Sequence, residues 1–150
     1  GIDFSAVSDG SRSVSSNLLD DYEEGTFTPN ITGLTTTGTW ATTITAGYYT
    51  KIGNRVFLHG SFYGTGGTGT GNLLLSGLPF ASAHGGYTSG GIQVNDSLTF
   101  PTGTITTPWY GWDATHFTMR CSKSNAAFSY LQIPSAVNYI RFDINYITNE

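Results

Sequence analysis

The feature that most limits how this chain can fold is a pair of strand-like runs between Gly47 and Tyr63, separated by Gly53-Asn54. Both runs are rich in aromatic and β-branched residues, and a Gly-Asn pair suits the positive φ angles of a primed two-residue hairpin turn. The pairs across such a hairpin are Ile52 with Arg55, Lys51 with Val56, Thr50 with Phe57, Tyr49 with Leu58 and Tyr48 with His59. The sequence therefore predicts a long antiparallel hairpin.

Alternation along the two strands divides the side chains of this hairpin between two faces. The first face carries Tyr49, Val56, Leu58 and Phe62, and we expect it to belong to the core. The second face carries Tyr48, Ile52, Phe57, His59 and Tyr63. Because the second set is half apolar and half polar, we expect it to be covered as well, by a second sheet or by another copy of the chain.

Short strand-like segments, separated by turn signals, recur along the rest of the chain. We expect strands over residues 2–6, 26–31, 40–45, 73–78, 91–95, 97–100, 116–122, 127–133 and 137–147. The segment 26–31 contains Pro29, which favours an edge position because proline has no N–H to donate to a ladder. A helix-like pattern appears at residues 17–25, where Gly25 ends it after barely two turns, and residues 101–113 are expected to be irregular and to lie on the surface.

Two late strands alternate clearly enough to assign their faces. Over residues 116–122, Phe117, Met119 and Cys121 share one face, and His116, Thr118 and Arg120 share the other. Over residues 137–147, Ile140, Phe142, Ile144 and Tyr146 share one face, and Arg141, Asp143 and Asn145 share the other. Many short strands without a long helix predict an all-β fold, an antiparallel β-sandwich of jelly-roll type.

The composition narrows the possible partners. Charged residues make up 11% of the chain, against roughly 25% in an ordinary globular domain, so the surface is expected to be rich in hydroxyl and amide groups. Six Lys and Arg residues and a net charge of −4 argue against a nucleic-acid partner. No apolar run approaches the ~20 residues of a membrane span, and the single cysteine, Cys121, excludes an intrachain disulfide.

The organisation along the chain is simple. Residues 1–16 are polar and rich in serine, which indicates a connector from upstream sequence, and residues 17–150 are expected to form a single domain. The chain shows no signal peptide, and Gly1 stands where an initiator methionine would be, so we expect a fragment or processed tail of a longer protein.

Four segments, in this order, resemble the C-terminal tip domains of tailed-bacteriophage tail fibres and tail spike-like proteins. They are Leu18-Leu-Asp-Asp-Tyr-Glu-Glu-Gly-Thr-Phe-Thr-Pro29, Tyr48-Tyr-Thr-Lys-Ile-Gly-Asn-Arg-Val56, Gly69-Thr-Gly-Asn-Leu73 and Ser76-Gly-Leu-Pro-Phe80. The likeness covers residues 17–150, and the segment before it resembles the connector that joins such tips to an upstream fibre shaft.

The resemblance implies a homotrimeric receptor-binding tip in the virion tail fibre, made in the cytoplasm of the bacterial host. Such a tip attaches to the host by binding a surface glycan, a polysaccharide or a lipopolysaccharide, without catalysis, cofactor, metal or membrane insertion. Two alternatives stay open. The domain could be a structural trimerisation cap of the fibre, or the accessory carbohydrate-binding domain of a depolymerase whose catalytic part lies upstream of Gly1.

The candidate ligand-binding residues lie in the Gly-interrupted segment Pro108-Trp-Tyr-Gly-Trp-Asp113. Sugars present flat C–H faces that stack on aromatic rings, and hydroxyl groups that need polar partners, as ligand sites in general provide. Trp109, Tyr110, Trp112 and Asp113 offer both kinds of group, and Trp40 and Tyr87 are the next candidates. The alternative is that these rings fill a loop core or the trimer seam, because aromatic side chains mostly bury their area in cores.

Other residues that could carry chemistry have simpler interpretations. Asp20, Asp21, Glu23 and Glu24 could hold a hard cation or supply the paired carboxylates of a glycosidase, but clustered acids of this spacing are more typical of a solvated or interface surface. The glycines of residues 64–69 match a dinucleotide fingerprint in form only, because no helix follows them.

The histidines and the cysteine also favour structural roles. His59, His84 and His116 are scattered without a metal or nucleophile motif around them. Asp113 and His116 are near enough in sequence to form a pair, and Cys121 is expected to be a small core residue. The sequence thus predicts no catalytic and no metal-binding residue.

Overall fold

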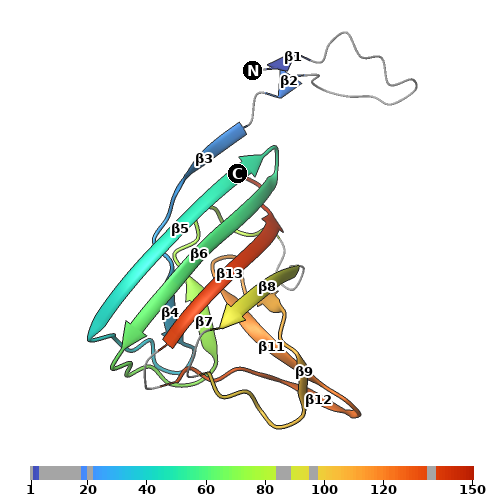
Figure 1. Cartoon of the computed structure of the whole chain (residues 1–150). Coiled ribbons are helices and arrows are strands. Elements are labelled where there is room, and N and C mark those ends of the chain that lie inside the picture. The colour runs from blue at the N-terminus through green and yellow to red at the C-terminus, as the bar shows by residue number, and fades with distance from the viewer. Residues whose placement is uncertain (1, 4–17, 20–21, 84–88, 95–97, 135–137) are drawn as a thin grey trace.

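The computed structural model describes the chain except residues 1, 4–17, 20–21, 84–88, 95–97 and 135–137, and for 2–3, 18–19, 89–94 and 138 it describes the backbone alone. The described residues form thirteen strands and no helix, in three antiparallel sheets (Figure 1). A small sheet pairs β1 (Ile2–Asp3) with β2 (Leu18–Leu19), while the two larger sheets make up the body of the domain. The predicted all-β class is confirmed.

The first large sheet is built around the predicted hairpin. Its five strands, in spatial order, are β3 (Tyr22–Thr26), β5 (Thr42–Ile52), β6 (Arg55–Thr65), β13 (Asn138–Ile147) and β8 (Ser89–Val94). The register of β5 with β6 is the predicted one, from Ile52 opposite Arg55 to Tyr48 opposite His59. Gly53 has φ +56° whereas Asn54 has no positive φ, which is the pattern of a type II′ turn.

The second large sheet is organised around β11 (Phe117–Lys123), which pairs with four strands. The remaining strands are β4 (Asn30–Gly33), β7 (Leu73–Ser76), β9 (Thr104–Thr106), β10 (Trp109–Gly111) and β12 (Ala126–Tyr130). The first half of β11 lies between β7 and β10, and its second half pairs with β9 and β12. Beyond β7, β4 is an edge strand, which agrees with the proline just before it.

The two large sheets share one hydrophobic core. The five-stranded sheet contributes Val56, Leu58, Phe62, Ile140, Phe142, Ile144 and Tyr146, and the six-stranded sheet contributes Ile31, Leu73, Leu75, Trp109, Phe117, Met119 and Cys121. Rings from the two sheets touch directly, with centroids 6.2 Å apart for Trp109 and Phe142 and 5.4 Å apart for Phe117 and Tyr146. The faces assigned to β11 and β13 from alternation are therefore correct.

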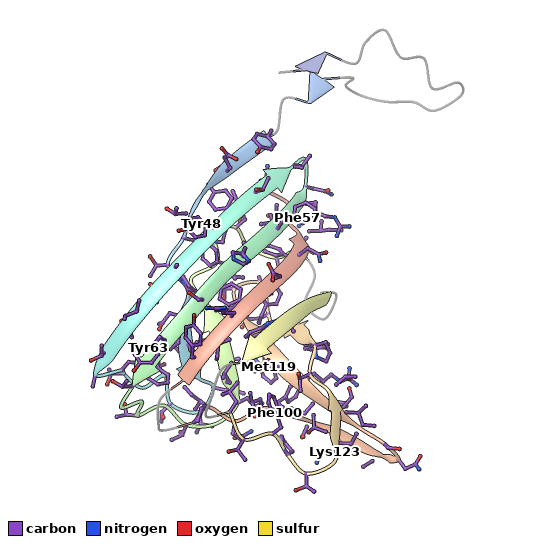
Figure 2. The ribbon with its side chains drawn as sticks, viewed as in Figure 1. Tyr48, Phe57, Tyr63, Phe100, Met119 and Lys123 are labelled. Atoms are coloured by element: carbon purple, nitrogen blue, oxygen red, sulfur yellow. The ribbon has the colours of Figure 1, made fainter. Side chains whose placement is uncertain are left out.

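The opposite face of the five-stranded sheet is exposed. Figure 2 shows Tyr48, Phe57 and Tyr63 along this face, and its exposed large side chains are Tyr22, Ile44, Tyr48, Ile52 and Phe57. We call this surface the outer face. The second large sheet packs on the inner side of the hairpin, and within the described residues no sheet of the same chain lies over the outer face.

Several predicted elements are wrong in the structure. The helix-like segment 17–25 contains β2 and most of β3 instead, because two turns of helix are marginal and β3 gains a ladder with β5. Gly25 does not end a helix but makes room for a ring, since a Cβ there would lie 2.8 Å from the Tyr49 hydroxyl oxygen. Residues 98–100 form no strand, and the strand predicted over residues 40–45 begins at Thr42 instead, as the first part of the longer strand β5.

The segment 101–113 is not the irregular surface loop that the sequence predicts. It contains β9 and β10, both of which pair with β11. Each of these strands has three residues, too few for alternation to stand out in the sequence. Pairing with β11 therefore decides the structure here, and it places Trp109 in the core.

Candidate functional site

The structure separates the residues that the sequence grouped as one ligand site. Along β10, Trp109 and Gly111 face the core and Tyr110 faces outward, as strand alternation requires. Trp109 is 0% exposed, so its ring is not available to a ligand at the surface. Tyr110 and the next ring, Trp112, are half-buried on the solvent side.

Of the two lower-ranked candidates, Trp40 lies in the described part of the chain and does not join this site. Trp40 packs edge-on against Phe62 at 5.2 Å, and its indole N–H donates to the carbonyl of Ile31 at 2.7 Å, so it closes one end of the core. Tyr87 lies outside the described residues.

Four rings gather on the solvent side of β10, β11 and β12 and form what we call the aromatic cluster. They are Tyr110, Trp112, Phe128 and Tyr130. Tyr130 lies in the middle, with its ring centroid 5.4 Å from that of Trp112, 5.5 Å from Phe128 and 6.3 Å from Tyr110. Phe128 is 46% exposed and the other three are half-buried, so the cluster presents edges and faces to solvent.

Sequence reasoning missed Phe128 and Tyr130. Both lie on β12, two residues apart and so on one face, and β12 reverses from β11 through a turn in which Asn125 has φ +53°. Arg120 pairs with Tyr130 across the ladder, which puts β12's rings on the outward face already assigned to Arg120. The alternation of residues along β11 and β12 could have predicted that these side chains face outward. The four rings come together, however, only through the register of the paired strands.

Arg120 lies among these rings. Its guanidinium carbon is 3.8 Å from the centroid of the Phe128 ring and 5.8 Å from that of Tyr110, which are cation–π distances. Within the described part of the chain, no carboxylate forms an ion pair with Arg120, and its buried Nε has no hydrogen-bond partner. The cluster therefore carries a positive charge that no carboxylate among the described side chains pairs with.

A compact turn between β10 and β11 follows Trp112. The Trp112 N–H donates to the carbonyl of His116 at 2.9 Å, and the Asp113 carboxylate accepts from the Thr115 N–H at 2.8 Å. Asp113 Oδ1 is also 2.9 Å from His116 Nδ1, so the pair suggested by the sequence is present. Asp113 thus orders the turn that carries Trp112. The ligand contact expected for Asp113 stays a prediction.

These contacts favour the deprotonated, negatively charged form of the Asp113 side chain. Burial alone would raise its pKa, but the hydrogen bonds from the Thr115 backbone and from the His116 and Thr115 side chains outweigh burial. The pKa of Asp113 consequently lies below its ordinary value of 3.8.

The outer face of the five-stranded sheet is a second candidate surface. At its centre the imidazole of His59 meets the Asp143 carboxylate at 2.7 Å, with both side chains about 70% exposed. Tyr48 lies opposite His59 on β5, and the Tyr63 and Tyr139 rings pack 6.4 Å apart further along. This broad sheet face, with aromatic rings among polar and charged side chains such as Arg55, Arg141 and Asp143, suits a protein neighbour better than an enclosed small-ligand site.

Other forms of site find little support in the described residues. No three of the His, Cys, Asp and Glu side chains described here gather closely enough to hold a metal ion. Cys121 is buried, and burial raises the pKa of its thiol, which agrees with the core role expected for it. In the described part of the chain, no helix has the length and apolar character needed to cross a membrane.

Comparison with known proteins gives one structural likeness. No protein-family model matches the chain, and no curated protein matches it. The chain is similar to the crystal structure of Dettilon tailspike protein (gp208), with a TM-score of 0.59 and 17% sequence identity over 84% of this chain. It spans 24% of the length of that tailspike chain. At this identity the likeness shows a shared fold and does not by itself transfer a function.

Proposed function

We propose that this chain is the receptor-binding tip of a phage tail fibre or tailspike-like protein, and that it binds a host surface glycan on the aromatic cluster without catalysing a reaction. The observation that carries the proposal is four aromatic rings gathered on the solvent side of a rigid sheet, beside an ordered turn. The shared fold with a tailspike protein supports the placement in a phage tail.

The chemistry of the cluster fits a sugar. Aromatic rings held partly exposed offer apolar faces to the C–H groups of a pyranose, and each carries large contact area at little conformational cost. Hydroxyl groups of Tyr110, Tyr130 and Thr115 lie on or near this face and can exchange hydrogen bonds with sugar hydroxyls. The strands beneath are fixed by the core, so the rings are ordered before a ligand arrives.

The same proposal assigns the outer face to assembly. An exposed sheet face with Ile44, Tyr48 and Phe57 is costly in water, and a homotrimer would cover it with the neighbouring copy. Assembly and binding then use opposite sides of the domain, because the aromatic cluster lies on the second sheet. A jelly-roll β-sandwich is the fold type that we propose for each copy.

Binding to an array of bacterial surface oligosaccharides tests the function. We expect the purified chain to bind a restricted set, and Trp112→Ala and Tyr130→Ala to weaken binding at least about tenfold. Phe57→Ser, on the outer face, is the matched control and should leave contact with the sugar itself unchanged.

The rival functions give different results. A structural cap would bind none of the oligosaccharides while keeping its assembly. If the chain belongs to a depolymerase, this domain would bind the polysaccharide while an upstream part cleaves it. New reducing ends produced by the isolated chain from a bound polysaccharide would contradict the proposed absence of catalysis.

A further inference from the structure

We infer that Arg120 recognises an acidic group, so that the glycan taken by the aromatic cluster is an anionic saccharide carrying a carboxylate or a phosphate. This inference rests on the proposed function and names the ligand class of the same site. Its basis is a cation placed among aromatic rings with no carboxylate of the described chain paired to it.

Arg120 differs from Arg141, which also stacks on a ring, because the Arg141 Nε donates to the Tyr139 hydroxyl at 2.8 Å. Among the described side chains, the Arg120 guanidinium lies against rings and not against a carboxylate, with its carbon 3.8 Å from the centroid of Phe128 and 5.8 Å from that of Tyr110. Its Nε is buried without a hydrogen-bond partner in the described structure, so part of the guanidinium has lost water and gained no acceptor.

The geometry of a guanidinium explains why an acid is the fitting partner. Stacking uses the flat face of the group and leaves its N–H bonds, which point outward in the plane, to an acceptor. A carboxylate or phosphate can accept two parallel N–H bonds from that edge, and such charge-assisted pairs are about twice as strong as neutral ones. The neighbouring rings would then hold the sugar ring that carries the acid.

The plainer role is that Arg120 stabilises the β11–β12 hairpin through its stacked rings alone. Such cation–π contacts are worth about 0.5–1 kcal/mol at exposed sites. This role would lower the stability of an Arg120 variant, but it would not make binding depend on the charge of the ligand. Comparing the binding of a charged ligand with that of its neutral counterpart therefore distinguishes the two roles.

The test uses matched pairs of oligosaccharides on the array. Each uronic-acid member has a carboxyl-reduced counterpart, and each phosphorylated member has a dephosphorylated counterpart. We expect the parent chain to prefer the acidic member of a pair, and Arg120→Gln to weaken that binding roughly 10- to 100-fold while leaving the neutral counterpart unchanged. Which kind of pair shows the effect distinguishes a carboxylate from a phosphate.

Two further variants make the result specific. Arg120→Lys keeps the positive charge but loses the planar guanidinium group. We therefore expect its binding of the acidic oligosaccharide to lie between that of the parent chain and that of Arg120→Gln. Arg141→Gln is the matched control, because Arg141 also stacks on a ring, that of Tyr139 at 5.1 Å, but lies on the outer face. Thermal unfolding of each variant shows whether the fold is retained.

The outcomes separate this inference from the proposed function. If acidic and neutral members bind equally and Arg120→Gln matches the parent, the inference is wrong while glycan binding stands. If no oligosaccharide binds, or if Trp112→Ala binds as the parent does, the proposed function fails and the inference fails with it.

Discussion

A single step along β10 separates a core ring from a surface ring. Trp109 packs against Phe142 of the opposite sheet, whereas Tyr110 joins the aromatic cluster. The residue types could be recognised as candidates from the sequence, but their facing could not, because a three-residue strand shows no period. For Arg120 the reverse holds: alternation along residues 116–122 gives its outward facing, while the rings that surround it come from two other strands.

The two tryptophans of this segment should respond differently to truncation. We expect Trp109→Ala to lower the free energy of unfolding by about 3–5 kcal/mol, because it empties a fully buried site. Trp112→Ala, which loses mainly its contact with Tyr130, should cost about 1 kcal/mol. Urea denaturation followed by circular dichroism measures both values, and equal losses would contradict the two placements.

Asp113 should make stability depend on acid pH. Its pKa is lower in the folded chain than its ordinary value of 3.8, so its stabilising contribution is complete above that pH and is lost as pH falls through the folded pKa. Asp113→Asn should therefore melt below the parent at neutral pH, with a difference that shrinks in acid. Thermal melts from neutral pH down to about pH 2 measure this difference, and one that stays constant throughout would show that the carboxylate is not held as described.

At the scale of elements, the hairpin of β5 and β6 was predictable because three signals agree. The Gly53-Asn54 pair, the period of two and the β-branched and aromatic residues all favour one register, and the structure has it. The segment that became β3 offered no such agreement. Its acidic residues resemble the start of a helix, and only pairing with β5 makes it a strand.

The turn itself gives a test of this register. Gly53 has φ +56°, and a Cβ there would meet nothing within 4 Å, so a larger residue would be disfavoured by backbone conformation alone. We expect Gly53→Val to lower the free energy of unfolding by roughly 1–2 kcal/mol. Asn54→Ala is the control and should cost less, because Asn54 has no positive φ. Equal costs in chemical denaturation would argue against the II′ turn.

At the scale of the whole molecule, the two large sheets expose surfaces of different character. The outer face is broad, with apolar side chains spread over β3, β5 and β6 (Figure 2). The aromatic cluster is small and holds Arg120, which no carboxylate among the described side chains pairs with. The sequence predicted that the second side of the hairpin would need a cover. It could not predict the cluster, which depends on the register of β12 with β11.

Assembly through the outer face should be sensitive to charge placed there. We expect the parent chain to elute as a particle of three times its 16.0 kDa mass, and Phe57→Glu to shift it toward one chain mass, because burying an unpaired carboxylate is costly. Phe128→Glu, an equally exposed phenylalanine on the other sheet, should leave the particle mass unchanged. Light scattering after size exclusion gives the masses, and a parent chain of single mass would contradict the trimer.

In the proposed function, a sugar binds this domain at the aromatic cluster. The most direct measurement is a crystal structure of the chain with an oligosaccharide that it binds on the array. We expect a sugar ring in van der Waals contact with Tyr130 and Trp112, at roughly 3.5–4 Å between carbon atoms. A sugar bound on the outer face instead, with the aromatic cluster empty, would contradict the account.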